Sequence, residues 1–269
     1  MLPNLFILGG QKCGTTSVFK ALTSHFDVYI PRAKEAHIFN TETTLSNIPI
    51  RYQRFFKDWN GEHLVGDATP NYLSSERAAV GIETLCPDAK LVVILRNPID
   101  RAYSAYWHAC REGAIRTSFE DALDKEKYRA SSGDPWSQIL YDGCYFTHLS
   151  RYKSFFNKDR VTVIVFEELI TEPSLILNRL ADDLGIQNTK LSMLNATNVA
   201  SRSWLPLLLR SLMAEKFKSL HERTLSPFTP PPMSKTTRAK LRQYYSQDIR
   251  LLHESIVPAI LQWWESDIL

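Results

Sequence analysis

Residues 5–17 constrain this chain more than any other segment. Leu5 to Leu8 are all apolar and predict a short buried strand, and the stretch from Gly9 to Gly14 that follows is rich in glycine. Beyond it the pattern changes to that of an amphipathic helix. A strand, a glycine-rich turn and a helix N-terminus leave free backbone N–H groups at the positive end of the helix dipole. The segment therefore predicts an anion site, above all for phosphate.

The spacing of Gly9 and Gly14 matches the GxxxxG of nucleotide-binding phosphate loops, but the residues after it do not. Those loops continue with Lys and then Ser or Thr. This chain continues with Thr15 and Thr16 and carries its lysine inside the loop, at Lys12. The loop still suits phosphate, yet it suits magnesium–nucleotide chemistry poorly, because there the missing lysine contacts the terminal phosphates. A generic nucleotide-binding protein therefore remains an alternative at this point.

A second motif follows an apolar run at Leu91–Leu95, which is typical of a strand buried on both faces of a parallel sheet. Arg96 stands at the carboxyl end of this strand, where open α/β sheets bind ligands. Asn97 is a good helix N-cap, and Pro98 suits the first helical position. Ser104 lies about two turns into that helix, so we expect Arg96 and Ser104 to converge on one anion.

Taken alone, Arg96 would be interpreted as the partner of a carboxylate. Together with the first loop it favours a ligand, because a nucleotide with phosphates at both ends of its ribose needs two anion sites. The chain offers two candidate anion sites, the glycine-rich loop and the pair Arg96 and Ser104.

Apolar runs typical of strands recur along the chain, at Leu5–Leu8, Val28–Ile30, Leu64–Gly66, Leu91–Leu95 and Val161–Val165. Helical patterns separate most of them. This predicts an α/β fold, a phosphate-loop-like parallel sheet flanked by helices on both faces. We expect a helix over Pro173–Gly185 with Gly185 as its C-cap, and a helical C-terminal part over Lys235–Trp264. A single domain spanning residues 1–269 is expected.

Composition excludes several classes of protein. The 269 residues are 44% hydrophobic and 23% charged, with a formal net charge of +3 and no Lys/Arg stripe, so a nucleic-acid partner is not expected. The four cysteines are scattered without metal spacing, which argues against a metal site. No apolar run is long enough to span a membrane, and no secretion signal is visible, so we expect a cytoplasmic protein. A Golgi enzyme trimmed of its anchor would look similar.

The segment Gly10-Gln-Lys-Cys-Gly-Thr-Thr-Ser17 resembles the 5′-phosphosulfate loop of sulfotransferases that use 3′-phosphoadenosine 5′-phosphosulfate (PAPS). The strand–Arg96–x-Pro98–helix–Ser104 arrangement resembles their 3′-phosphate site. The similarity is closest to the heparan-sulfate-type branch and its bacterial relatives. Further segments that fit the family pattern are Pro31–Phe39, Gly66–Tyr72, Gly143–Leu149 and Val165–Leu169.

The resemblance implies transfer of the sulfuryl group from PAPS to a hydroxyl or amine of a small-molecule or glycan acceptor, without a metal and with adenosine 3′,5′-diphosphate as product. The implied donor-binding residues are Gln11, Lys12, Cys13, Gly14, Thr15, Thr16, Ser17, Arg96, Ser104 and Arg202. Backbone N–H groups from Gly14 to Ser17 would hold the phosphate, and Lys12 would stabilise charge on the departing oxygen. Asp67, Tyr72 and Tyr145 are expected on the acceptor side, although the roles of Asp67 and Arg202 stay open.

The acceptor must lose a proton, which needs a base close to the sulfuryl group. In the heparan-sulfate-type enzymes a glutamate has this role, and by resemblance it falls on Glu35, with His37 as the rival. Several glycan-modifying relatives have a lysine where this chain has Ala68, which favours a smaller or less acidic acceptor. A kinase-like phosphotransferase and a non-catalytic nucleotide binder are the alternatives. We expect a monomer or weak homodimer.

Overall fold

The computed structural model describes residues 1–126, 135–186, 191 and 230–264. Its five strands are β1 (Leu5–Gly9), β2 (Val28–Tyr29), β3 (Leu64–Asp67), β4 (Lys90–Leu95) and β5 (Val161–Val165). The helices of the first half are α1 (Thr15–Thr23), α2 (Ile48–Phe55), α3 (Glu76–Leu85), α4 (Pro98–Arg111) and α5 (Phe119–Glu126). Those of the second half are α6 (Pro135–Tyr141), α7 (Tyr145–Phe155), α8 (Phe166–Thr171), α9 (Pro173–Leu184), α12 (Lys235–Ser255) and α13 (Leu261–Trp264).

The strands form one sheet in the order β2-β3-β1-β4-β5, and every neighbouring pair is parallel. After β1 the chain builds β2 and β3 on one side of it, and it then crosses to add β4 and β5 on the other side. The strand order thus reverses around β1, and in open α/β sheets the ligand crevice lies at the carboxyl ends of the strands beside such a reversal. β1 and β4 are hydrogen-bonded neighbours, so the glycine-rich loop and Arg96 leave the same edge of the sheet.

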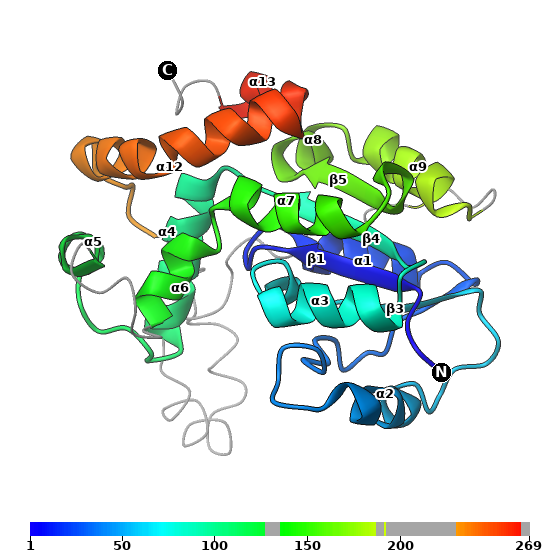
Figure 1. Cartoon of the computed structure of the whole chain (residues 1–269). Coiled ribbons are helices and arrows are strands. Elements are labelled where there is room, and N and C mark those ends of the chain that lie inside the picture. Colours follow the sequence, from blue (N-terminus) through cyan, green and yellow to red (C-terminus); the bar gives the residue numbers. More distant parts are fainter. Residues whose placement is uncertain (127–134, 187–190, 192–229, 265–269) are drawn as a thin grey trace, which may run out of the picture.

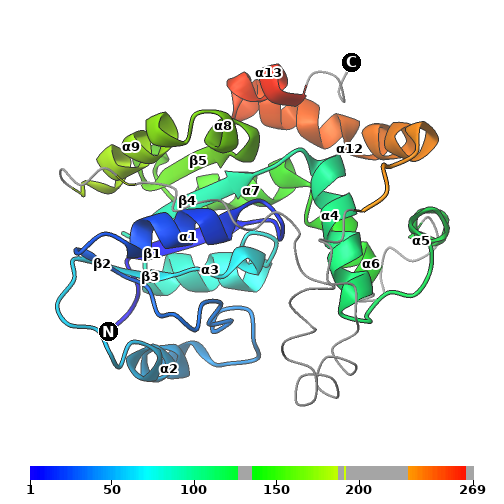
Figure 2. The same cartoon turned by 180° about the vertical axis from the view of Figure 1, so that it is seen from behind.

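Helices cover both faces of this sheet. Helix α1 lies over one face, and α3 and α7 lie over the other (Figures 1 and 2). The C-terminal α12 packs across α4 and α7. The predicted fold class is confirmed, including the helical C-terminal part.

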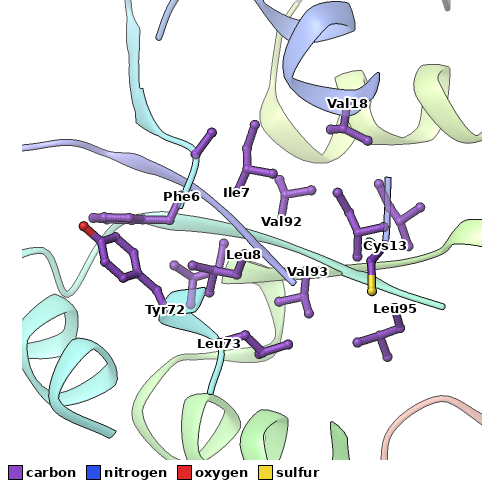
Figure 3. Packing of buried hydrophobic residues seen from close by; sticks show 14 of the residues in the cluster. Phe6, Ile7, Leu8, Cys13, Val18, Tyr72, Leu73, Val92, Val93 and Leu95 are labelled. Carbon is purple, nitrogen blue, oxygen red and sulfur yellow. The ribbon is translucent and has the colours of Figure 1, made fainter. Parts of the chain in front are cut away.

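Burial explains why the central strands are apolar throughout. Every residue of β1 is buried, as is every residue of β4 after Lys90. Figure 3 shows Ile7 and Val92 on the side of Val18 in α1, whereas Leu8 and Val93 point toward the side of Leu73. A strand with a helix layer on each face has no position for a polar side chain, so the apolar run is continuous instead of alternating.

Element ends follow local chemistry. The helix predicted from Pro173 ends at Leu184, where Gly185 adopts the left-handed conformation with φ 67°. The helical stretch predicted over 235–264 is confirmed in type, but it is not continuous. Helix α12 ends at Ser255, and a short 3-10 turn beginning at Pro258 separates it from α13. That the whole chain forms one domain stays a prediction.

Asn97 caps α4 as predicted: its side-chain oxygen accepts hydrogen bonds from the amides of Ile99 (3.0 Å) and Asp100 (3.3 Å). We predict that Asn97→Ala lowers the free energy of unfolding by about 1 kcal/mol, the usual cost of losing such a cap. Urea unfolding measures the effect. Ser75→Ala, which removes the hydrogen bond to the Ala78 amide at the start of α3, should cost a similar amount. An Asn97→Ala variant as stable as the wild type would contradict the assignment.

Candidate functional site

The loop between β1 and α1 has a constrained backbone. Gly14 has φ 86°, and a Cβ atom there would lie 2.6 Å from the ring of Phe166, so only glycine fits. Lys12 also adopts a positive φ, 73°, which is uncommon for a residue with a side chain. Loops held in such conformations by their surroundings cluster at ligand sites.

The first turn of α1 carries neither a capping side chain nor an acidic residue. By contrast, α3 has Ser75 as its cap and α4 has Asn97, each followed by an acidic residue in the first turn. Within the described residues, the amides of Gly14, Thr15 and Thr16 donate to no other group. These three N–H groups, the cradle, lie at the positive end of the helix, and their binding of an anion stays a prediction.

One predicted donor is corrected. The amide of Ser17 donates to the carbonyl of Gly14 at 2.9 Å, so it belongs to the first helical turn and its N–H is already satisfied. The side chain of Ser17 is half-buried beside the cradle. Its contribution to a bound anion would therefore come from the hydroxyl group.

Arg96 lies next to the loop, as its place at the end of β4 predicts. Its guanidinium donates to the carbonyl of Lys12 at 3.0 Å and stacks over the ring of Phe166, 5.0 Å from its centroid. Ser104 is half-buried on α4. The structure thus brings Arg96 to the first loop, while its convergence with Ser104 on one anion stays a prediction.

Two residues at the start of α8 support both parts of the site. Phe166 packs against Gly14 and under Arg96. The carboxylate of Glu167 accepts from the Asn97 amide at 2.9 Å and from the indole of Trp264 at 3.0 Å. The segment after β5 marks a strand end, as expected. Its side chains contact both the loop after β1 and the residues that follow β4.

The segment from Lys34 to His37 reaches the start of α1. Lys34, Glu35 and His37 have φ values of 40°, 59° and 51°, so this segment is also strained. The Lys34 ammonium donates to the Thr16 hydroxyl at 3.0 Å. The Glu35 carboxylate lies 3.8 Å from that ammonium and 3.6 Å from Nε2 of His37. The structure therefore brings Glu35 and His37 to the cradle, with Glu35 about half exposed (43%).

Asp67 and Tyr72 are fully buried, so the expectation that they contact an acceptor is corrected. Asp67 accepts hydrogen bonds from Tyr52 (2.6 Å), Thr69 (2.6 Å) and Tyr72 (3.0 Å). Burial raises the pKa of the Asp67 carboxyl above its ordinary value, although these hydrogen bonds act in the opposite direction. Asp67 is the centre of a buried polar network.

This network anchors the segment that carries Glu35. The hydroxyl of Tyr72 accepts from the amides of Ile38 (2.8 Å) and Phe39 (3.2 Å), directly after His37. Tyr72 and Asp67 therefore fix, from the buried side, the segment that carries Glu35.

The expectation that Tyr145 contacts the acceptor is corrected in the same way. It is fully buried, and its hydroxyl donates to the Arg96 carbonyl at 2.8 Å and lies 3.5 Å from the sulfur of Cys13. Cys13 is itself fully buried, with its side chain pointing into the core (Figure 3), and burial raises the pKa of its thiol. Only the backbone of Cys13 can serve a ligand in this conformation.

His108 is a residue that the sequence patterns did not single out. It lies on α4, one turn after Ser104, and is half-buried. Burial, followed by the positive charges of Lys12 and Arg111, lowers its pKa below the ordinary 6.5, while Glu35 is among the groups acting in the opposite direction. His108 therefore lies near both Lys12 and Glu35. The i, i+4 spacing from Ser104 was the signal that could have identified it.

Arg202 lies outside the described residues. Within the described part of the chain, no group of three or more His, Cys, Asp or Glu side chains could hold a metal ion. The helices described there include none that is both long and apolar enough to cross a membrane.

The family model described as a sulfotransferase domain matches residues 2–222. The chain belongs to the sulfotransferase family. Its resemblance to heparan-sulfate-type enzymes is also confirmed. The human bifunctional heparan sulfate N-deacetylase/N-sulfotransferase 1 is 30% identical over 202 residues, which are 70% of this chain and 22% of that protein. Human heparan sulfate glucosamine 3-O-sulfotransferase 3B1 is 28% identical over 190 residues, which are 69% of this chain and 47% of that protein.

A bacterial sulfotransferase has a similar structure. The crystal structure of a sulfotransferase from Alicyclobacillus acidocaldarius aligns with a TM-score of 0.73 and 28% identity, covering 98% of this chain and 99% of that chain. The match to the human relatives, by contrast, spans about a fifth and about half of their lengths.

The buried network around Asp67 generates a prediction. Asp67→Asn replaces an acceptor of three hydrogen bonds by a group that must donate on one side, so we expect a loss of about 1–3 kcal/mol in the free energy of unfolding. Faster hydrogen exchange is expected at the amides of Ile38 and Phe39. Asp121→Asn, at an exposed position on α5, is the matched control. Unchanged exchange at both amides in Asp67→Asn would contradict the anchoring role.

Proposed function

We propose that this sulfotransferase domain moves the sulfuryl group of PAPS to a hydroxyl or amine of a small-molecule or glycan acceptor. The observation that carries the proposal is the uncapped N-terminus of α1, where Lys34 donates to the Thr16 hydroxyl and Arg96 donates to the Lys12 carbonyl of the preceding loop. Membership of the sulfotransferase family supports it.

The two ends of the donor would be bound by different elements. The amides of Gly14, Thr15 and Thr16, with the hydroxyls of Thr15, Thr16 and Ser17, are proposed to bind the 5′-phosphosulfate. Arg96 and Ser104 are proposed to bind the 3′-phosphate, with Gln11 and Cys13 shaping the loop. Arg202 stays a proposed donor contact. PAPS supplies an activated sulfuryl group, and no metal is needed for this assignment.

The residues at the cradle have separate chemical tasks in this proposal. Glu35 takes the proton of the acceptor hydroxyl or amine. Lys12 stabilises the negative charge that develops on the phosphate oxygen as the sulfuryl group leaves. His37, 3.6 Å from Glu35 and hydrogen-bonded to Asn40 at 3.2 Å, orients the carboxylate.

His108 is a second candidate for the proton transfer. Its lowered pKa favours the neutral form at pH 7, so it can accept a hydrogen bond there. We place Glu35 first because the Lys34–His37 segment brings its carboxylate to α1 and leaves it accessible.

The acceptor is proposed only by class. The names of the matched human proteins specify heparan sulfate. In this chain Ala68 is buried with 1% exposure and offers no charge, which favours a smaller or less acidic acceptor. The expected cytoplasmic location and the monomer or weak homodimer stay predictions.

A kinase-like activity is the alternative. Thr15 follows Gly14 where nucleotide phosphate loops have lysine, and Arg96 at a separate strand end is not needed for ATP. A non-catalytic binder is disfavoured by Glu35, His37 and His108 around the same cradle. Comparing adenosine 3′,5′-diphosphate with ADP–magnesium in thermal-shift measurements separates these functions.

Arg96→Ala is expected to abolish the preference for adenosine 3′,5′-diphosphate over adenosine 5′-monophosphate, in the absence of magnesium. A charge-assisted anion contact contributes about 1.5–3 kcal/mol, which corresponds to tenfold or more in affinity. Isothermal titration calorimetry measures both nucleotides. Arg179→Ala, whose side chain pairs with Glu168 on the surface, should leave the preference unchanged. Equal affinity of the wild type for the two nucleotides would refute the 3′-phosphate assignment.

Glu35→Gln keeps the shape of the side chain but cannot accept a proton. We predict a fall in turnover of about a hundredfold or more with nearly unchanged nucleotide affinity. His37→Ala and His108→Ala should reduce turnover less, and Glu42→Gln, exposed in the following loop, should have no effect. The assay measures transfer from labelled PAPS to a panel of acceptors. If Glu35→Gln stays active and one of the histidine variants is inactive, that histidine is the base instead of Glu35.

A further inference from the structure

The ammonium group of Lys34 lies in an unusual place for a lysine. The side chain is only 16% exposed, and the group rests beside the first turn of α1 and 5.7 Å from the centroid of the Phe19 ring. Its hydrogen bond to the Thr16 hydroxyl is to a neutral acceptor. The Glu35 carboxylate, 3.8 Å away, is beyond hydrogen-bond distance.

The electrostatic potential at this helix end opposes a cation, and the Glu35 carboxylate 3.8 Å away offsets it only in part. The N-terminus of a helix is its positive end, where carboxylates and phosphates are stabilised and cations are not. Lysine ordinarily keeps its charged end in water. Here burial lowers the pKa of Lys34, and the neighbouring Glu35 offsets this only in part. Lys34 is therefore held against the same potential that the free amides of Gly14, Thr15 and Thr16 present to a ligand.

We propose that Lys34 is a second cationic contact to the 5′-phosphosulfate group of the donor, acting together with Lys12. The inference rests on the proposed function and goes beyond it. It makes Lys34 a residue that binds the donor, and not only the neighbour of the proposed base Glu35. An anion bound at the start of α1 would give the ammonium a second charged partner, next to Thr16 and in addition to Glu35. The bound anion would also neutralise the positive potential at the start of α1, which opposes the charge of the Lys34 ammonium.

The position of Lys34 has a consequence for catalysis. One ammonium contacts Thr16 in the cradle and approaches Glu35, the residue proposed as base. The same side chain therefore ties the donor site to the segment that carries the base. A lysine that only paired with Glu35 would affect turnover and the position of this segment, but not the affinity for a 5′-phosphate.

Three nucleotides separate these roles: adenosine 5′-monophosphate, adenosine 3′-monophosphate and adenosine 3′,5′-diphosphate. Lys34→Met is expected to weaken the two nucleotides with a 5′-phosphate by a similar factor, about tenfold or more, and to leave the 3′-monophosphate unchanged. Lys34→Arg should retain most of the affinity because it keeps the charge. Lys20→Met, on the exposed side of α1, is the matched control. Calorimetry measures affinity, and urea unfolding of each variant shows whether the fold is retained.

The outcomes are distinguishable. Wild-type affinity of Lys34→Met for both 5′-phosphorylated nucleotides would overturn the inference while leaving the proposed function intact. An equal loss for all three nucleotides would also overturn it, because that result indicates general disruption of the site. If Lys34→Met does not fold, Lys34→Gln, which can still donate to Thr16, takes its place under the same criteria. A wild-type protein that binds none of the three nucleotides would refute the proposed function itself.

Discussion

The site depends on the positive potential at the start of α1. Helices usually satisfy their first amides with a capping side chain or an acidic residue, and α1 has neither. Basic residues come from three elements near those amides: Lys12 is in the loop itself, Arg96 at the end of β4 donates to the Lys12 carbonyl, and Lys34 after β2 donates to the Thr16 hydroxyl. Like charges gathered around a helix N-terminus repel one another, so the folded protein must hold them in place by other interactions.

Two networks, one buried and one half-buried, supply that support. On one side, Asp67 and Tyr72 hold the strained segment that carries Glu35 through hydrogen bonds to the amides after it. On the other side, Glu167 connects the cap of α4 to Trp264, and Phe166 fills the space below Gly14. The hydrogen bonds of Asp67 are buried, which makes them costly to break, whereas those of Glu167 are part-buried.

Sequence patterns located the elements well where the signal is local. The apolar runs of β1 and β4, the Asn97 cap and the Gly185 end of α9 follow from side-chain chemistry within a few residues. The patterns were less informative about burial. Asp67, Tyr72 and Tyr145 occur in segments shared with the family, and such segments include residues that support a site as well as residues that contact a ligand. The spacing of His108 from Ser104 places both residues on one face of α4, but it does not show that Lys12 and Glu35 lie near His108.

The sequence by itself determined the class of fold, the phosphate loop, the strand-end arginine and the segment that bears the base candidate, because each is encoded in a short run of residues. The tertiary structure alone decided which of these side chains meet. Gly143 illustrates the difference: a Cβ atom there would lie 2.8 Å from the ring of Tyr245, a residue about a hundred positions away. The approach of Lys34 to Thr16 likewise depends on the packing of separate elements. Long-range packing sets distance, burial and electrostatic environment, and no local pattern contains them.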